Sequence, residues 1–233
     1  DQRGMSFSHV TKLRMVMQEI FRQAYRSRLI AFDPSDGLKL PKNEKRSHRS
    51  ITDEERTHIL EVASYHPSGL WVLLILYTGL RPGEAAALQW KDIDFDRNEI
   101  HVYKAIESGT STIKTPKTPA GIRDIPMRKD LRQLLWNVRG DPFSLLFPTR
   151  KGTIRSPTSV WKLWNSFAKE LDLHMGAEEQ DGKIVHHAIA PDLTLYCLRH
   201  TFCTDLQRAG VAINIAKELM GHSSIAVTAD IYT

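Results

Sequence analysis

Thr78-Gly79-Leu80-Arg81-Pro82-Gly83-Glu84 is the stretch that decides the fold, because it places one sharp turn between two helices. A buried helix is expected before it, over residues 69–78, with a glycine as its stop. Pro82 suits the first turn of a second, short helix. Arg81 then stands at a helix start, where the helix dipole disfavours a cation. A bound anion would account for Arg81, and a structural ion pair with Glu84 is the alternative.

Downstream of this turn the sequence changes to short β-prone segments followed by helical ones. A small antiparallel sheet is expected from strands at residues 93–95, 100–106, 112–117 and 122–126. Helices are expected at residues 129–138, 157–171, 196–209, 213–220 and 225–231. Residues 174–192 are expected to form a loop or an extra hairpin. The predicted fold class is therefore α+β, mainly α-helical.

Upstream of the turn lie a long amphipathic segment and a linker. Apolar residues recur at helical spacing over residues 8–29, and Lys and Arg occupy much of the remaining surface. That surface is either a solvated charged face or a face that contacts phosphates. Residues 33–49 combine Pro, Gly and polar residues without a period, as expected for a linker. Thr52 and Glu55 then form a capping-box pattern that opens the next domain.

Charge is concentrated at the front of the chain. The 233 residues carry a net charge of +5 at neutral pH, with a pI of about 9.2, which favours a polyanionic partner. Residues 1–49 contain eleven Lys and Arg against five acids, a net of +6, so the remainder carries −1. A flexible basic linker is suited to wrapping a phosphate backbone, from which it would release counterions. The candidate DNA contacts there are Lys39, Lys42, Lys45, Arg46 and Arg49.

Composition excludes several protein classes. With 41% hydrophobic and 25% charged residues, the chain is typical of a globular protein, not of a disordered, collagenous or disulfide-rich one. Cys197 and Cys203 are expected about 9 Å apart on one helix, too far for a disulfide. The longest apolar run, residues 70–76, is too short to span a membrane, and no signal-peptide core is present. We expect a cytoplasmic, nucleoid-associated protein that does not contact membranes; its first residue, Asp1, indicates a longer parent.

Common catalytic signatures are missing from the sequence. No P-loop, serine-hydrolase elbow, HExxH or paired CxxC motif occurs. His186 and His187 are adjacent in a polar segment without carboxylate or Cys neighbours in the sequence, which favours a solvated pair over a metal site. The tryptophans are expected in the core, and not to stack on bases. They are Trp71, Trp90, Trp136, Trp161 and Trp164.

Four motifs follow one another from residue 78 to the end of the chain. They are Thr78–Glu84, Pro116-Lys117-Thr118 ahead of Ile122–Pro126, Leu198-Arg199-His200-Thr201, and Leu219–Ser224 leading to Ile231-Tyr232-Thr233. Together they resemble the tyrosine recombinase (phage integrase) family, with most similarity to integrases of conjugative transposons. The resemblance implies a catalytic domain over residues 50–233. It further implies that residues 1–32 are the C-terminal helix of a partial core-binding domain and that residues 33–49 are the basic linker between the two.

The resemblance implies site-specific recombination of duplex DNA. Tyr232 would attack a scissile phosphate and form a 3′-phosphotyrosyl link, releasing a 5′-hydroxyl that later attacks this link from another strand. No metal, ATP or other cofactor is expected. Arg81 and Arg199 match the two arginines that hold the non-bridging oxygens. Lys117 matches the general acid for the departing 5′-oxygen, and His222 matches a further donor to the phosphate.

Tyr196 departs from the family pattern, which usually has His at this position. A phenol can donate a hydrogen bond to phosphate but is a poor proton acceptor near neutral pH. We therefore expect Tyr196 to support charge or positioning, with a packed core tyrosine as the alternative. Lys114 is the nearest competitor of Lys117 for the acid role and is expected to contact DNA. Glu84 is expected to orient Arg81.

The resemblance also implies an assembly. The family acts as a tetramer on two duplexes, and an accessory DNA-bending protein is a candidate further partner. Two other activities remain open at this point. One is relaxation of supercoiled DNA by a type IB topoisomerase, and the other is DNA binding by a regulator of the same fold that does no chemistry.

Overall fold

The chain forms two compact units, residues 1–47 and 48–233. The computed structural model describes residues 6–40, 49–107, 112–116 and 118–232. The first unit contains helix α1 (Phe7–Arg26), as predicted, and Ser6 caps it by accepting a hydrogen bond from the backbone N–H of His9. None of the residues of α1 is buried. The boundary between the units places Arg49, predicted to lie in the linker, within the second unit.

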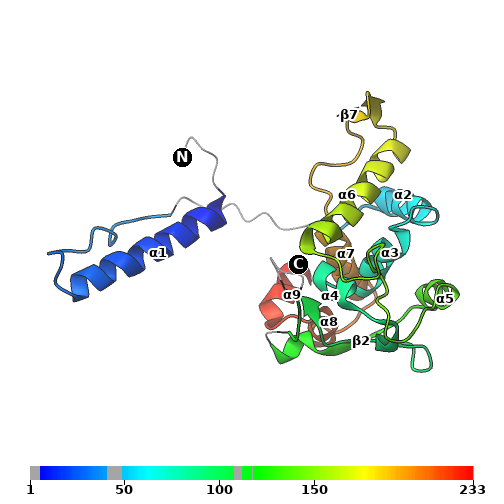
Figure 1. The fold of residues 1–233 in the computed structure, drawn as a ribbon, viewed down its shortest axis with the longest axis horizontal. Coiled ribbons are helices and arrows are strands. Elements are labelled where there is room, and N and C mark those ends of the chain that lie inside the picture. Colours follow the sequence, from blue (N-terminus) through cyan, green and yellow to red (C-terminus); the bar gives the residue numbers. More distant parts are fainter. Residues whose placement is uncertain (1–5, 41–48, 108–111, 117, 233) are drawn as a thin grey trace. The chain divides into compact units, whose positions relative to one another are not determined.

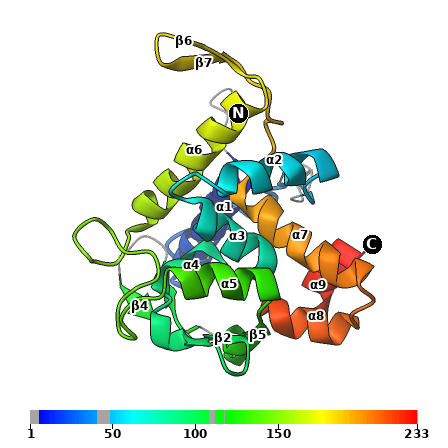
Figure 2. The same cartoon turned by 90° about the vertical axis from the view of Figure 1, so that its right-hand side faces the viewer.

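The second unit begins with helix α2 (Asp53–Ala63), capped as the sequence predicts. The Thr52 hydroxyl accepts from the Glu55 backbone N–H at 3.1 Å, and the Glu55 carboxylate accepts from the Thr52 N–H at 2.8 Å. Helix α2 packs on α3 (Gly69–Thr78) and on α6 (Pro157–His174). Nearly all of α3 is buried, as is typical of a helix that is apolar on every side. It forms the centre of the unit, with α2, α4, α5 and α7 packed around it (Figure 2).

The turn after α3 forms as predicted. Gly79 ends the helix with φ 61°, a left-handed conformation that glycine adopts without strain. A Cβ at this position would collide with the ring of Phe202, so the close approach of α7 (Leu195–Arg208) also requires glycine. Helix α4 (Pro82–Ala87) starts three residues after Gly79, with Arg81 as its N-cap residue. The turn therefore holds Arg81 beside α7.

In the part of the chain that the structure describes, five short strands lie between α4 and α5, and Figure 1 labels β2 among them. They are β1 (Ile93–Asp94), β2 (Glu99–Val102), β3 (Ala105–Ile106), β4 (Ile113–Lys114) and β5 (Arg123–Pro126). Strand β2 pairs antiparallel with β1 and β5, and its Ile100 lies opposite Ile93 and Ile125. All three isoleucines are buried, so this face of the sheet joins the core. Strands β3 and β4 form a separate antiparallel pair.

The single strand predicted at residues 100–106 is two strands. Tyr103 and Lys104 separate β2 from β3, and both contact Asp92. The Tyr103 hydroxyl donates to Asp92 Oδ1 at 2.7 Å, and Lys104 Nζ lies 2.8 Å from Asp92 Oδ2. Lys104 is buried, and its charge is compensated by this carboxylate.

The rest of the chain follows the predicted order of elements. It comprises α5 (Lys129–Asn137), α6, the hairpin β6 (Glu178–Gln180) and β7 (Lys183–His186), α7, α8 (Ile213–Met220) and α9 (Ile225–Tyr232). Cys197 and Cys203 are free, buried thiols on α7. Residues 174–192, expected to form either a loop or an extra hairpin, contain the hairpin of β6 and β7. The predicted α+β class with a small antiparallel sheet is confirmed.

Two predicted core tryptophans are at the surface instead. Trp71, Trp90 and Trp164 are buried, whereas Trp136 and Trp161 are each about half exposed. Helical periodicity identifies the face of a helix that can be covered, but not whether another element covers it. Among the helices in the described part of the chain, none combines the length and the apolar character needed to cross a bilayer.

Candidate active site

Three arginines donate hydrogen bonds to consecutive backbone carbonyls at the C-terminal end of α8. The pairs are Arg123 Nε with Leu219 at 2.7 Å, Arg199 Nη2 with Met220 at 2.5 Å and Arg81 Nη2 with Gly221 at 2.8 Å. The last carbonyls of a helix have no partner within it, and the dipole there attracts cations. The end of α8 thus brings together arginines from three motifs that are far apart in the sequence.

Glu84 holds two of these arginines. Its carboxylate accepts from Arg123 Nη2 at 2.9 Å and from Arg81 Nη1 at 2.7 Å, and from the Arg81 backbone N–H at 2.8 Å. Burial opposes the charged carboxylate, but the hydrogen bonds from Arg123 and the charges of Arg123 and Arg81 outweigh it and lower the Glu84 pKa to about 2. Glu84 orients Arg81, as expected, and forms with it the ion pair that was the alternative to a bound anion. The ion pair and anion binding by Arg81 are compatible, because the Arg81 side chain is 40% exposed.

Arg199 is buried on α7 beneath this cluster. It also donates to the carbonyl of Gly79 at the turn after α3. Burial, followed by the charges of Arg81 and Arg123, lowers the Arg199 pKa to about 9. The guanidinium still carries its charge at neutral pH, but in surroundings that disfavour it. A bound anion would relieve this unfavourable burial.

His222 immediately follows the carbonyls that hold the arginines. Gly221 ends α8 with φ 63°, and a Cβ there would lie 2.7 Å from Arg123 Nη1. His222 is 8% exposed, and its Nδ1 lies 2.9 Å from the Thr228 hydroxyl of α9. Burial, followed by the positive charges of Arg199 and Arg81, lowers the His222 pKa to about 4. The imidazole is therefore neutral at pH 7.

Helix α9 packs on α7 and α8 and ends at Tyr232, the predicted nucleophile. The Tyr232 side chain lies outside the described residues. Thr228 is fully buried and contacts His222. Position 232 follows position 228 by four residues, about one turn along the same helix face. The backbone of α9 thus carries position 232 on the side of the helix that faces His222.

The remaining predicted catalytic residues are placed as follows. Tyr196 is 46% exposed on α7, so it is not the packed core tyrosine considered as the alternative. It lines an open pocket with Arg81 and with Trp161 of α6. Lys117 lies outside the described residues. Ala120, three residues further on, has its carbonyl oxygen 3.1 Å from where a Cβ on Gly221 would lie, so the segment after Lys117 packs against the end of α8.

The predicted DNA-contacting residues fall into three groups. Lys42, Lys45 and Arg46 lie outside the described residues. Lys39 is exposed, and Lys114 on β4 forms an ion pair with Glu107 at 2.8 Å. Arg49 is held within the second unit, because it donates to Glu55 at 2.6 and 2.7 Å and to Asp192 at 3.0 Å. These carboxylates raise the pKa of Arg49 and tie the start of the unit to the loop before α7.

His186 and His187 are solvated as expected, with side chains 78% and 67% exposed, but His187 has a carboxylate partner that was not expected. His187 Nδ1 lies 2.5 Å from Oδ2 of Asp172, a buried carboxylate that also accepts from the backbone N–H groups of Ala188 and Ile189. This partner was missed because Asp172 lies on α6, and the fold brings it back to the end of the hairpin.

Sequence reasoning also missed three residues at the site. Arg123 was noted only as part of a motif, Thr228 was not noted, and Trp161 was assigned to the core. The signal for Arg123 was its position on a strand next to the Gly121 turn, where a buried arginine needs an acidic partner. No local pattern marks Thr228, because its role depends on α9 packing on His222.

Comparison with known proteins decides the family. The profile described as the phage integrase family matches residues 49–233, most of the chain. The chain belongs to the phage integrase family. Among its relatives are a tyrosine recombinase XerC-like protein of Caldanaerobacter subterraneus subsp. tengcongensis, 28% identical over 100% of this chain and 63% of the relative, and the transposase from transposon Tn916 of Enterococcus faecalis, 26% identical over 78% and 47%. This chain thus spans about half to two-thirds of the length of these relatives.

Solved structures show that the fold is shared across the phage integrase family. The integrase of transposon Tn1549 in complex with a circular intermediate DNA superposes with a TM-score of 0.79, at 24% identity, over 100% of this chain and 77% of that chain. A lambda integrase dimer bound to a core site gives 0.65, at 18% identity, over 97% and 59%. Both likenesses confirm the fold predicted from the four motifs.

Proposed function

We propose that this chain carries the catalytic domain of a site-specific DNA recombinase. The observation that supports the proposal most directly is the meeting of Arg81, Arg199 and His222 at the end of α8. Two of the guanidinium groups there, those of Arg81 and Arg123, share the Glu84 carboxylate, and the third, that of Arg199, is held by backbone carbonyls. Such a cluster is suited to an anion on which negative charge increases during the reaction.

In the proposed reaction, the Tyr232 oxygen attacks the scissile phosphorus as the bond from phosphorus to the 5′-oxygen breaks. The phenol loses its proton to the solvent, and the departing 5′-oxygen gains one from Lys117. Arg81 and Arg199 neutralise the charge that builds on the non-bridging oxygens, because guanidinium offers parallel donors and keeps its charge. The number of phosphodiester-type bonds is unchanged, so the later attack by a 5′-hydroxyl on the phosphotyrosine needs no energy source.

His222 acts in this proposal as a neutral donor. Its lowered pKa leaves the ring uncharged at pH 7 before DNA binds. If Thr228 donates its hydroxyl to Nδ1, the other ring nitrogen, Nε2, carries the N–H that reaches the phosphate. Tyr196, at the edge of the same pocket as Arg81, supplies a second uncharged donor and does not remove the proton of Tyr232.

The proposed partner is duplex DNA. The relatives solved with DNA support this partner, as does the basic segment that ends the first unit. Lys39, Lys42, Lys45 and Arg46 are proposed to contact the phosphate backbone, and Lys114 to approach DNA beside Lys117. We further propose a tetramer on two duplexes, aided by an accessory DNA-bending protein, in the nucleoid of the cytoplasm.

A covalent trapping experiment tests the proposal. Duplexes that bind the protein are first selected from a random pool. The selected site is then prepared with a nick next to the scissile phosphate, so that cleavage frees a short fragment bearing the 5′-hydroxyl, which diffuses away. A denaturing gel should then show a slowly migrating protein–DNA adduct with the wild-type chain. Tyr232→Phe should form none, because it lacks the nucleophilic oxygen.

Tyr65→Phe is the matched control, since Tyr65 is an exposed tyrosine on the same unit and should leave the adduct unchanged. An adduct that persists in Tyr232→Phe would move the nucleophile elsewhere. DNA binding without any adduct would favour a non-catalytic regulator. Relaxation of supercoiled plasmid without recombined product would favour a topoisomerase.

A further inference from the structure

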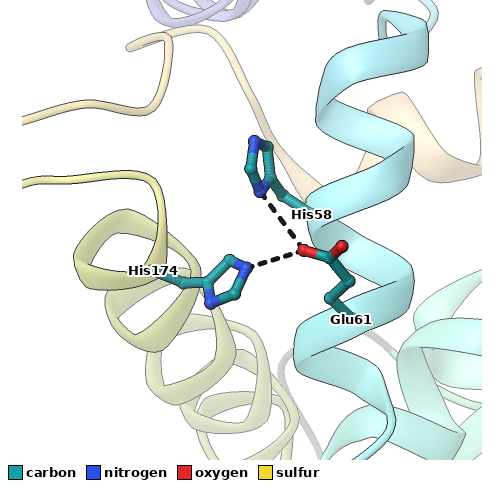
Figure 3. Close-up of side chains that lie close together, drawn as sticks. All are labelled: His58, Glu61 and His174. Atoms are coloured by element: carbon teal, nitrogen blue, oxygen red, sulfur yellow. Dashed lines mark hydrogen bonds and ion pairs between the residues drawn. The ribbon is translucent and has the colours of Figure 1, made fainter.

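Two histidines and a glutamate meet where α2 packs on the end of α6 (Figure 3). His58 and Glu61 lie three residues apart on α2 and therefore share one helix face, and His174 is the last residue of α6. Glu61 Oε2 lies 2.9 Å from His174 Nε2 and 3.6 Å from His58 Nδ1. None of the three takes part in the contacts of the candidate active site described above. This group is called the α2–α6 cluster below.

The hydrogen bonding of the α2–α6 cluster is incomplete. His58 Nδ1 is buried and has no hydrogen-bond partner among the described residues, although it faces Glu61 Oε2. A buried nitrogen without a partner is unfavourable. The same carboxylate oxygen accepts from His174, so two imidazoles converge on one acceptor. A cation among the three side chains would bind both imidazoles and the carboxylate at once.

We propose that the α2–α6 cluster binds one zinc ion. Its ligand atoms lie within 4.8 Å of one another, whereas tetrahedral zinc requires ligand atoms about 3.3 Å apart. Side-chain rotations that move the ligand atoms about 1.5 Å or less closer together would therefore give the spacing that zinc requires. Two imidazoles and one carboxylate are a donor set that zinc accepts, with a fourth position left for water. All three side chains are partly exposed, which gives the ion a path of entry.

The surroundings hold the three ligands in place. Ile59 and Val62 anchor α2 in the core on either side of Glu61. One turn away, the Tyr65 hydroxyl donates to Glu170 Oε1 of α6 at 3.2 Å, so the two helices are already in contact. His174 stands at the C-terminal end of α6, where the helix dipole favours a cation. Zinc would therefore link two helices that are already packed together, with little further loss of conformational entropy.

The proposed role of the metal is structural. It would join α2, which opens the second unit, to α6, which carries Trp161 at the pocket beside Arg81. Because the ion would bind the folded chain through residues from two helices, it should stabilise the folded state by mass action. The site does not depend on the recombinase activity proposed above, and its test does not measure that activity.

Untagged protein, freed of metal by a chelator, should bind one zinc ion per chain in isothermal titration calorimetry. Cobalt(II) should give the strong visible absorption of a four- or five-coordinate site. At a zinc concentration about 100 times Kd, the melting temperature should rise by about 5 to 10 °C. His58→Ala, His174→Ala and Glu61→Gln should each weaken binding at least about 10-fold, as expected when one of three protein ligands is lost.

His186→Ala is the matched control, because it removes an exposed histidine from the neighbouring hairpin and should bind zinc as the wild type does. Glu61→Gln keeps the size of the side chain, so circular dichroism of this variant separates loss of a ligand from loss of the fold. A wild-type chain that binds no zinc would overturn the proposal. So would three cluster variants that bind zinc as the wild type does, or a loss of binding in His186→Ala.

Discussion

Arg123 and Glu84 form a two-pronged ion pair that is closed to solvent. Nη2 and Nη1 of Arg123 lie 2.9 and 3.2 Å from the two carboxylate oxygens, and the side chains are 1% and 4% exposed. Glu84 also holds Arg81, whose side chain is 40% exposed. Arg123 therefore acts on the site through Glu84, as a positioning residue, while Arg81 is accessible at the pocket that Tyr196 also lines.

Replacing Arg123 with Met should destabilise the fold. The substitution leaves Glu84 buried without its main partner, so the free energy of unfolding should fall by about 3 to 5 kcal/mol. Urea denaturation followed by circular dichroism measures this change. Arg97→Met, which removes an exposed arginine 4.0 Å from Asp94, should cost less than about 1 kcal/mol. Equal costs for the two variants would contradict a buried, paired role for Arg123.

Arg81→Lys should reduce cleavage while preserving the fold. Lysine keeps the positive charge near Glu84 but loses the planar pair of donors that matches a phosphate. The rate of adduct formation in a single turnover should fall by about 100-fold, as for loss of one well-placed donor to a transition state. Affinity for uncleaved DNA should change much less. A loss of affinity as large as the loss of rate would assign Arg81 to binding instead.

Tyr196→Phe tests the departure from the family pattern. If the phenol only donates to the phosphate, the variant should slow adduct formation by about 10-fold and leave the shape of the pH–rate profile unchanged. Tyr196 is half exposed on α7, so losing the hydroxyl should not affect stability. A changed pH profile would show that Tyr196 takes part in proton transfer. Trp161→Phe, at the same pocket, controls for a general change in shape.

The elements predicted correctly are those decided by neighbours in the sequence. The stop at Gly79 needs only a left-handed residue, and the capping box at Thr52 needs only a partner three residues on. The amphipathic pattern of residues 213–220 likewise needs only helical spacing, and it matches α8. Each signal is complete within one or two turns of chain, so packing elsewhere did not change the outcome.

The features that were missed depend on contacts between distant segments. Arg123 has a role only because β5 lies beside both Glu84 and the end of α8. His187 contacts Asp172 of another element, and Trp161 is exposed because no element in the described part of the chain covers that face of α6. The motif resemblance identified Arg81, Arg199 and His222 by type. Only the fold explains why they meet, since each motif contributes to the same helix end.

Replacing Arg49 should affect stability, whereas replacing the other basic residues predicted to contact DNA should affect DNA binding. Arg49→Ala should lower the free energy of unfolding by about 2 kcal/mol, because Glu55 would stay buried without its charged partner. Its effect on the salt dependence of DNA binding should be small. Alanine at Lys39, Lys42, Lys45 or Arg46 should instead reduce the slope of log K against log salt by about 1 each. Fluorescence anisotropy across a salt series measures these slopes.

His222 should make the stability of the DNA-free chain depend on pH. Its pKa is about 4 in the folded chain and 6.5 when exposed, so below pH 6.5 the unfolded state takes up a proton that the folded state excludes. The contribution of neutral His222 to the free energy of unfolding is therefore full above pH 6.5 and is lost progressively as the pH falls toward 4. Between pH 7 and pH 5 the loss should be about 2 kcal/mol.

The difference between wild type and His222→Gln isolates this contribution from that of other groups. Glutamine can still bond to the Thr228 hydroxyl but does not titrate, so the variant should lose about 2 kcal/mol less than the wild type between pH 7 and pH 5. Urea denaturation at each pH gives both values. His186→Gln, which replaces an exposed histidine, should lose as much stability as the wild type between pH 7 and pH 5. Parallel pH profiles for wild type and His222→Gln would mean that the folded chain accepts the proton, and hence that the arginines around His222 do not keep it neutral.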